Sequence, residues 1–349
     1  MLNSKTKSHD TTYSFQFRNA VKKLPLGQIN YHKKNYIKYF KEDIGKVKDK
    51  KFLETGAGSG IHTTILSLIT NKNKNIIHSM DLLKSNIKKI NKFKKLYKLK
   101  NVKVYEHNLL DKIRTNVFYD FSCCHNWVQH TPKPERCIKN IFDKIKVDGK
   151  FYISTYHENF FRFTIAFIAR QIIKNKNKKK IIHHLIKNKN LVFDHDLSHY
   201  NNRDDIVLEN LTDDFTTPYI FLTNYKRLKE FIISQGFKLI TKEPKLGKVN
   251  FKDNHQLRMG FVKIKNCKKK IKKCFVNIDK EYEVMKSNKK YRDIYDFTKI
   301  LKKKFKYKSY DSCSKLLLEL YLFRAKTNKS KSKLKIEKLR TFLIRSIQY

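Results

Sequence analysis

The chain has 349 residues and a formal net charge of +48 at pH 7, from 79 Lys and Arg residues against 31 Asp and Glu residues. This length allows one large or two modest domains with a full hydrophobic core. Six cysteines without a Cys-x-x-Cys pair, in a chain whose segment 1–17 is polar, exclude the pattern of a secreted disulfide protein and predict reduced thiols in a cytoplasmic protein. The most apolar stretch, 160–173, contains two arginines and is too short for a transmembrane segment.

The positive charge comes mainly from lysine, because only twelve of the 79 basic residues are arginine. The lysines accompany many asparagine and isoleucine residues, a combination typical of an AT-rich genome. A dedicated nucleic-acid binder favours arginine, whose guanidinium group binds phosphates and base edges in bidentate fashion. We therefore expect only non-specific attraction of polyanions.

The segment 1–45 is aromatic and basic, with its clearest helical pattern at 29–40, and we expect a helical lead-in that caps a ligand site. An apolar strand at 51–55 then ends in a loop with glycines at positions 56, 58 and 60. Glycine allows positive φ angles and leaves no Cβ between the backbone and a ligand. The next helix is predicted to begin at Ile61.

Four further strands are predicted, at 76–80, 102–106, 119–124 and 150–155. A helix from about 134 to 145 and a turn at 147–149 separate the last two. Strands that alternate with helices predict a parallel sheet with helices on both faces. Ligands bind such sheets at the carboxyl ends of the strands, where this sequence places polar residues such as Asp81 and Asn108.

Three pieces of this pattern match a known family: the loop Glu54-Thr55-Gly56-Ala57-Gly58-Ser59-Gly60, the strand-end acid Asp81, and the block from Cys124 to Ser154. The chain resembles the class I S-adenosylmethionine-dependent methyltransferases, in particular the small-molecule, methyltransferase type 11-like subgroup. It departs from the family at Asp148, where a second glycine is usual. The resemblance implies an α/β fold, a Rossmann-like seven-stranded, mostly parallel sheet with helices on both faces. A hairpin of 237–241 and 256–264 would close this sheet.

The resemblance also implies S-adenosylmethionine as the cofactor, a sulfonium cation without phosphates. The loop agrees, because it lacks both the Gly-Lys-Ser/Thr of a phosphate-binding loop and the G-x-G-x-x-G of a dinucleotide site. The implied cofactor-binding residues are Glu54, Gly56, Ala57, Gly58, Gly60, Asp81, Leu82, Asn108, Leu109, His125 and Trp127. Asp81 would accept hydrogen bonds from the ribose hydroxyls. Trp127 either stacks on the adenine, lines the substrate pocket, or is plain core.

Methyl transfer needs a base only if the acceptor arrives protonated. His130 and His125 follow the fourth strand, at the tip expected nearest to the methyl group, and are the candidate catalytic bases. The alternative for His130 is a structural role, in which it caps the following helix or bonds a loop carbonyl.

The stretch 157–223 is longer than a crossover needs and is predicted to be an insertion with its own helices. Candidate substrate-binding residues within it are His195, His199, Tyr200, Asp214 and Tyr219. The two histidines at i and i+4 would also suit a divalent metal, but a polar loop explains them equally and no metal is predicted. The segment 213–219 is either a lid over the acceptor or an ordinary loop. The helix at 160–173 faces either a core or a membrane surface.

We therefore expect three parts: the lead-in 1–45, a methyltransferase domain 46–265 with the insertion 157–223, and a lysine-rich helical appendix 266–349. The favoured function is methyl transfer from S-adenosylmethionine to an oxygen or nitrogen atom of a small-molecule acceptor. The alternatives are an RNA or protein methyltransferase, which the charge permits, and a non-catalytic binding protein that keeps the cofactor fold. The sequence does not indicate an oligomeric state.

Overall fold

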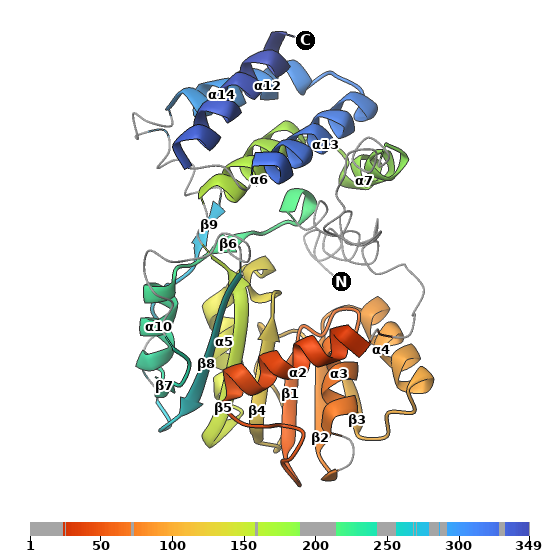
Figure 1. The fold of residues 1–349 in the computed structure, drawn as a ribbon, viewed down its shortest axis with the longest axis vertical. Coiled ribbons are helices and arrows are strands. Elements are labelled where there is room, and N and C mark those ends of the chain that lie inside the picture. The colour runs from red at the N-terminus through yellow and green to blue at the C-terminus, as the bar shows by residue number, and fades with distance from the viewer. Residues whose placement is uncertain are drawn as a thin grey trace. The chain divides into compact units, whose positions relative to one another are not determined.

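The structure is a computed structural model, and it describes residues 24, 26–70, 73–157, 160–188, 214–242, 256–267, 269, 271–278, 286, 292–327 and 332–348 (Figure 1). Contacts divide the chain into two compact units. We call residues 17–157 and 221–276 the sheet unit, and residues 1–16, 158–220 and 277–349 the helical unit. None of the helices in the described ranges combines the length and apolarity that crossing a membrane requires.

The sheet unit is built on seven strands in the order β3-β2-β1-β4-β5-β8-β7. Their bounds are Lys51–Thr55 for β1, Ile76–Asp81 for β2, Val102–Glu106 for β3, Tyr119–His125 for β4, Ile145–Tyr156 for β5, Phe237–Leu239 for β7 and Gln256–Lys263 for β8. Strands β1 to β5 run parallel, while β8 pairs antiparallel with both β5 and β7. The expected seven-stranded, mostly parallel sheet and its closing antiparallel pair are confirmed.

Helices cover both faces of this sheet, as expected. On one face, α2 (Leu26–Phe40) and α3 (Ile61–Thr70) pack around Phe40, Phe52 and Phe121. On the other face, α5 (Pro134–Phe142) and α10 (Tyr225–Ser234) pack around Phe142, Phe151 and Phe237. Helix α4 (Lys84–Leu96) lies against β3 and α3. Because both faces are covered, β1 and β2 are buried along nearly their whole length.

The chain between α5 and β5 differs from the sequence expectation. The helix ends at Phe142 instead of 145, and β5 already begins at Ile145, so the predicted turn at 147–149 lies within this strand. The pairing of β4 with β5 shifts register between Tyr119 and Phe121, which makes this part of β5 a bulge. Asp148 has a φ of +64° in the bulge, so a non-glycine residue occupies a conformation that favours glycine.

The described helices of the helical unit come from two segments that are far apart in the sequence. Helices α6 (Phe160–Ile172) and α7 (Lys178–Lys187) come from the insertion, and α12 (Arg292–Phe305), α13 (Tyr310–Thr327) and α14 (Ser332–Gln348) come from the C-terminal segment. Helix α6 packs against α12 and α13, and α7 packs against α13. The apolar residues Ile165, Ile168 and Ile172 of α6 are buried, which decides between the two readings of this helix in favour of a core-facing one. A separate two-stranded sheet joins β6 (Phe221–Leu222) and β9 (Val276–Asn277).

Candidate active site

The glycine loop connects β1 to α3 at the carboxyl edge of the sheet. Gly56 has a φ of +61°, and a Cβ at this position would overlap the ring of Trp127. The backbone N–H of Ala57 donates to the carbonyl oxygen of Met80 at 3.1 Å, which ties the loop to the neighbouring strand β2. Only glycine fits at Gly56, both for its backbone angle and for the close approach of the indole.

Asp81 ends β2 directly beside this loop. Its Oδ2 atom accepts a hydrogen bond from the backbone N–H of Gly58 at 2.8 Å. Its Oδ1 atom accepts from the N–H of Leu83 at 2.9 Å and from Nδ2 of Asn86 at 3.0 Å. Burial raises the pKa of this carboxyl group, and the hydrogen bonds oppose that shift. The structure therefore brings the strand-end acid and the glycine loop together.

The other residues predicted around the cofactor lie near this edge. Leu82 is partly exposed, at 38%. The segment after β3 reaches the same place, because the N–H of His107 donates to the carbonyl oxygen of Asp81 at 2.8 Å. Next to it, Asn108 accepts a hydrogen bond from the N–H of Leu110 at 3.1 Å, and Leu109 is buried. Their contacts with a ligand stay predictions.

Glu54 lies beneath the loop rather than on its surface. Its side chain is buried and accepts a hydrogen bond from the hydroxyl of Thr63, which also contacts the hydroxyl of Ser79 at 2.8 Å. Burial raises the pKa of Glu54 to about 8, so the carboxyl group is mostly protonated at pH 7. A direct contact with a cationic ligand would require this group to lose its proton.

Two buried polar atoms beside the loop have no hydrogen-bond partner among the described residues: Nε1 of Trp127 and Oδ1 of Asn86. Buried polar groups without partners are rare in proteins and indicate a missing water or ligand. A nucleoside offers hydroxyl donors and ring-nitrogen acceptors that match this pair. Together with the glycine cradle and Asp81, these atoms show that the residues present fit S-adenosylmethionine.

Three histidines from three elements meet at the same edge of the sheet. The rings of His62, at the start of α3, and His125, at the end of β4, stack with centroids 3.8 Å apart and an interplanar angle of 6°. His32 of α2 packs edge-on against His62 at 4.5 Å. The hydroxyl of Tyr36, also on α2, lies 3.2 Å from Nδ1 of His62 and 3.2 Å from Nε2 of His125. In the described ranges, no group of three or more His, Cys, Asp or Glu side chains has the geometry to hold a metal.

Burial lowers the pKa values of all three histidines. The pKa of His32 falls to about 4, with a further contribution from the positive charge of Arg258. The pKa values of His62 and His125 are also well below the ordinary range, through burial first and then through His32 and Arg258, with His125 adding to the effect on His62. All three imidazoles are therefore neutral at pH 7. Burial raises the pKa of Tyr36, which keeps its hydroxyl proton in place.

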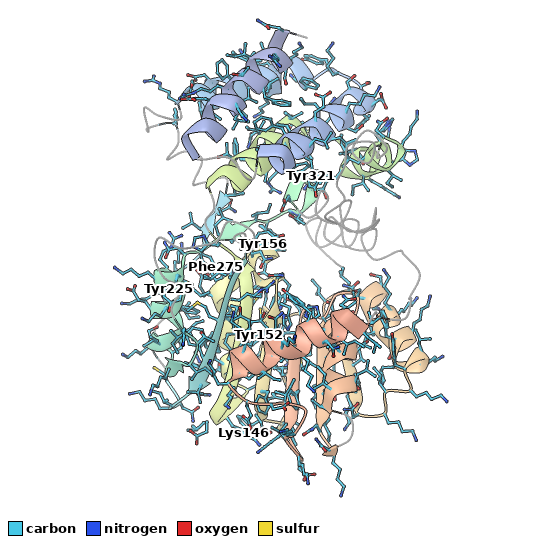
Figure 2. All side chains as sticks on the ribbon, in the orientation of Figure 1. Lys146, Tyr152, Tyr156, Tyr225, Phe275 and Tyr321 are labelled. Atoms are coloured by element: carbon cyan, nitrogen blue, oxygen red, sulfur yellow. The ribbon has the colours of Figure 1, made fainter. Side chains whose placement is uncertain are left out.

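Sequence reasoning named His125 but missed His32, Tyr36 and His62. A signal was present, because His32 and Tyr36 are spaced i, i+4 and so share one face of the predicted lead-in helix. His62 lies two residues after Gly60, the last glycine of the loop. What the sequence lacked was the position of α2 on the sheet. Tyr39 contributes to that position, because its ring stacks on Tyr152 of β5 at 4.6 Å and 3°. Figure 2 labels Tyr152.

His130, the other candidate base, occupies a more enclosed place. It ends a short 3-10 turn (Val128–His130), it is only 3% exposed, and its ring meets Tyr156 edge-on at 5.3 Å. Lys133 occupies the N-cap position of α5 and makes no side-chain capping hydrogen bond there. Trp127 packs on the core cluster and its ring lies against Gly56, while its contact with the adenine or the acceptor stays a prediction.

Of the predicted substrate-binding residues, His195, His199 and Tyr200 lie outside the described residues. Asp214 and Tyr219 belong to the helical unit, where Asp214 is buried and Tyr219 is half-buried. Between them, the carbonyl oxygen of Thr217 accepts a hydrogen bond from Arg170 of α6 at 2.6 Å. The segment is thus held against α6 in this unit.

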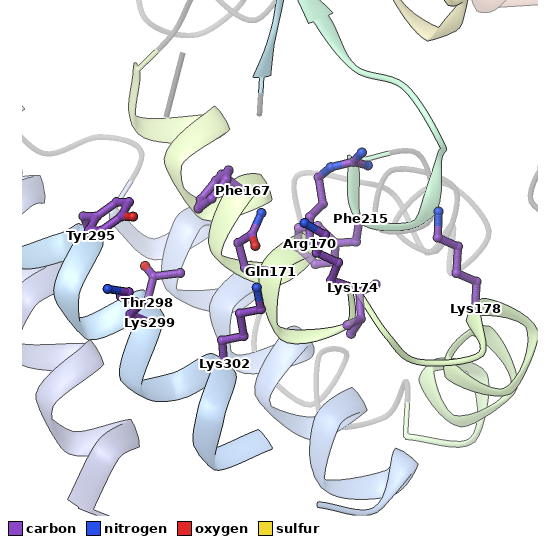
Figure 3. Close-up of a pocket in the computed structure, with 11 residues that line it drawn as sticks. Phe167, Arg170, Gln171, Lys174, Lys178, Phe215, Tyr295, Thr298, Lys299 and Lys302 are labelled. Atoms are coloured by element: carbon purple, nitrogen blue, oxygen red, sulfur yellow. The ribbon is translucent and has the colours of Figure 1, made fainter. Parts of the chain in front are cut away.

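Two cavities were not predicted. In the sheet unit, a cavity of about 780 Å³ is lined by residues of β2, β3 and the loop after β3, including Met80, Glu106 and Ile113. In the helical unit, a cavity of about 390 Å³ is lined from α6 and α12, and Figure 3 shows Lys174 and Lys302 at its edge. Five of the eleven lining residues of this second cavity are Lys or Arg, and none is Asp or Glu. We call it the cationic cavity.

Comparison with known proteins supports the reading of the sheet unit. Residues 46–210 match the family described as "Methyltransferase domain". The chain is 27% identical over 157 residues to the ubiquinone biosynthesis O-methyltransferase of Coxiella burnetii, in strain Dugway 5J108-111 and equally in strain CbuG_Q212. This match covers 45% of the chain and 63% of the relatives, so the chain spans less than two thirds of their length.

Among solved structures, the chain is similar to PKMT2 from Rickettsia typhi in complex with AdoHcy, at 13% identity over 63% of this chain and 50% of that one, with a TM-score of 0.41. It is also similar to the N-methyltransferase NodS from Bradyrhizobium japonicum WM9, at 12% identity over 43% of this chain and 75% of that one, with a TM-score of 0.34. At these TM-scores the likeness carries no information on function.

The strand order, the glycine loop and the family match to residues 46–210 together show the Rossmann-like fold of class I methyltransferases. The resemblance seen in the sequence is thereby confirmed. The cofactor of this domain class is S-adenosylmethionine, and the match in sequence covers the loop and Asp81 that would hold it.

Proposed function

We propose that this protein transfers a methyl group from S-adenosylmethionine to an oxygen or nitrogen atom of a small-molecule acceptor. One observation carries the proposal: the carboxylate of Asp81 and the backbone N–H of Gly58 lie 2.8 Å apart at the carboxyl edge of the sheet. Ligands of open α/β sheets bind at this edge. The family match to residues 46–210 supports the same activity.

Different residues of the sheet unit would bind different parts of the cofactor. Asp81 would hold the ribose hydroxyls, the loop 56–60 would pass close to the methionine part, and Trp127 would offer its unpaired indole N–H to a ligand acceptor. When bound, S-adenosylmethionine supplies an electrophilic methyl carbon on a positively charged sulfur. The protein's task is then to position the acceptor in line with that carbon.

For the base, the geometry favours His125 over His130. His125 ends β4 and is only partly buried, whereas His130 is enclosed and packs on Tyr156. A neutral imidazole can accept a proton from an acceptor that arrives protonated. Both assignments stay proposals.

We place acceptor choice in the insertion 157–223, with Asp214 and Tyr219 as its described candidate residues. Supporting this, the tips of the sheet strands are already taken up by the predicted cofactor residues. Removing the whole insertion is a poor test, because the apolar face of α6 packs on α12 and α13 and its loss would expose both helices. Tyr219→Phe is a gentler change, and we expect it to alter acceptor KM with little effect on cofactor affinity.

The name of the Coxiella relatives supports a small acceptor that carries a hydroxyl group. A polyanionic acceptor such as RNA is the second candidate, and the cationic cavity is the observation in its favour. The composition of the whole chain weakens that argument, since 79 of its 349 residues are Lys or Arg. A cytoplasmic location remains part of the proposal.

The test is a methyl-transfer assay with the full chain, read by mass spectrometry. The protein would be incubated with S-adenosylmethionine and, separately, a catechol, an amine and a structured RNA. We expect S-adenosylhomocysteine and one added methyl group on a small molecule. Methylation of the RNA alone would promote the second candidate, and cofactor binding without any transfer in a broad acceptor panel would favour a non-catalytic binding protein.

A further inference from the structure

The hydroxyl group of Tyr36 lies between two imidazoles, 3.2 Å from Nδ1 of His62 and 3.2 Å from Nε2 of His125. A phenol hydroxyl has one hydrogen to donate, whereas its oxygen can also accept. With both histidines neutral, Tyr36 donates to one of them and accepts from the other. The two possible arrangements differ only in which histidine nitrogen carries its proton.

His125 uses one ring nitrogen, Nε2, in the contact with Tyr36, and its other nitrogen, Nδ1, makes no hydrogen bond in the described part of the chain. His125 ends β4, and its backbone pairs with Ser154 of β5. The residue therefore lies at the carboxyl edge of the sheet, where the glycine loop and Asp81 also lie.

We propose that His125, Tyr36 and His62 form a proton relay that deprotonates a hydroxyl acceptor, so that the reaction is an O-methylation. The inference rests on the proposed function and narrows its acceptor to a protic oxygen. His125 would be the catalytic residue, and Tyr36 and His62 would be positioning residues that act through it.

The proton path balances. The acceptor hydroxyl gives its proton to Nδ1 of His125, Nε2–H of His125 passes its proton to the oxygen of Tyr36, and the Tyr36 hydroxyl proton moves to Nδ1 of His62. The acceptor oxygen forms its bond to the methyl carbon while the electron pair of the carbon–sulfur bond stays on sulfur. The positive charge that sulfur loses ends on His62. An amine acceptor that arrives neutral needs none of these steps.

The surroundings explain why the relay rests in its neutral form. His32 of α2 packs on His62, Tyr152 of β5 packs edge-on against His125 at 4.8 Å, and Arg258 of β8 adds positive charge. Cys123, Glu54 and Tyr152 also act electrostatically on Tyr36. Burial together with Arg258 lowers the histidine pKa values, so the base form persists when the pH falls through about 6.5.

A purely structural role does not explain why this cluster consists of polar rings. Burying polar rings costs free energy that apolar side chains of the same volume would avoid. Tyr39, one turn further along α2, shows the structural solution, because its ring stacks on Tyr152 and its hydroxyl makes no hydrogen bond among the described residues. Tyr39→Phe is therefore a matched control for Tyr36→Phe.

The first test does not require turnover. Histidine-selective ¹⁵N labelling of the full chain and an NMR titration would report the tautomer and pKa of each imidazole. We expect His62 and His125 to titrate together, with pKa values below the ordinary one, and Tyr36→Phe to change the tautomers of both at once. Tyr39→Phe should leave both unchanged. Independent titrations near the ordinary pKa, unaffected by Tyr36→Phe, would overturn the relay.

The second test uses a catechol, 3,4-dihydroxybenzoate, and an amine, 4-aminobenzoate, as acceptors. We expect transfer to the catechol, with kcat reduced at least tenfold in Tyr36→Phe and His62→Gln, an altered pH profile, and unchanged affinity for S-adenosylhomocysteine. Transfer to the amine alone, or a Tyr36→Phe rate equal to that of Tyr39→Phe, would overturn the proposal. If neither compound is a substrate, the titration decides alone. If the parent protein did not bind S-adenosylhomocysteine at all, that result would instead refute the proposed function.

Discussion

Glu54 is a carboxyl group held where it stays protonated at neutral pH. Burial raises its pKa to about 8, against about 4.3 in an unfolded chain. Between these values the folded state keeps a proton that the unfolded state releases. The free energy of unfolding therefore falls as the pH rises from about 4.5 to 8.

We expect Glu54→Gln to remove this pH dependence, because glutamine keeps the shape of a protonated carboxyl without its ionisation. At pH 7 the gain in unfolding free energy over the parent is about 3 kcal/mol, and at pH 4.5 it is near zero. Urea unfolding of both proteins at the two pH values measures the difference. If Glu54→Gln changed the unfolding free energy by the same amount at both pH values, Glu54 would be ionised in the folded state.

At this scale the sequence predicted the contiguous parts of the site and missed the rest. The glycine loop and Asp81 were readable because each stands at the end of an apolar strand, so its position follows from the strand. Tyr36 and His62 were not readable, since their meeting depends on how α2 packs on the sheet. Glu54 was read as a ligand contact, and its burial under the loop depends on Thr63 of α3.

Helix α2 is seated on β8 through a position where only glycine fits. A Cβ on Gly260 would overlap the carbonyl oxygen of Tyr39, the residue of α2 that stacks on Tyr152. Close backbone approach of this kind leaves no room for a side chain to move aside. Gly260 thus sets the position of the helix that carries His32 and Tyr36.

We predict that Gly260→Ala destabilises the protein by about 1–3 kcal/mol and disturbs the histidine cluster. Gly27→Ala is the control, because Gly27 also lies in α2 and has no atom near its would-be Cβ. That change should be neutral or stabilising by up to about 1 kcal/mol. Thermal unfolding measures both. Equal effects of the two substitutions would mean that α2 does not rest on Gly260.

Most elements of the sheet unit were predictable from hydrophobic periodicity and from the residues that end helices and strands. Helix α10 ends at Ser234, before Gly236, whose φ of +88° is a left-handed stop. The start of β5 was not predictable, because Asp148 adopts a positive φ without being glycine. The sequence around Asp148 was read as a turn between two elements, whereas the structure has a bulge within β5.

At the scale of the whole molecule, the helical unit was the least predictable part. Its insertion helices and C-terminal helices were each foreseen as helical. Their association in one unit was not, because no local pattern records that α6 packs on α12 and α13. The division into lead-in, domain and appendix stays a prediction, and the contact-based units cut the chain differently.

The charge of +48 leads to a prediction about polyanions. If the lysines reflect the composition of an AT-rich genome and not an RNA-binding function, binding of a random-sequence RNA should be weak and should vanish at roughly physiological salt. Lys299→Gln with Lys302→Gln, in the cationic cavity, should then weaken binding no more per charge than Lys338→Gln on the exposed face of α14. Filter binding over a salt series tests this. Selective binding that persists at that salt and depends on the cavity lysines would favour an RNA acceptor.

The central claim is that Asp81 and the glycine loop bind S-adenosylmethionine, and calorimetry with its product S-adenosylhomocysteine tests it most directly. We expect one site per chain and at least tenfold weaker binding in Asp81→Ala, since a hydrogen-bonded charged group contributes about 1.5–3 kcal/mol. Gly58→Val should weaken binding similarly, while the exposed Lys338→Gln should not change it. Tight binding of NAD with no affinity for S-adenosylhomocysteine would contradict the account.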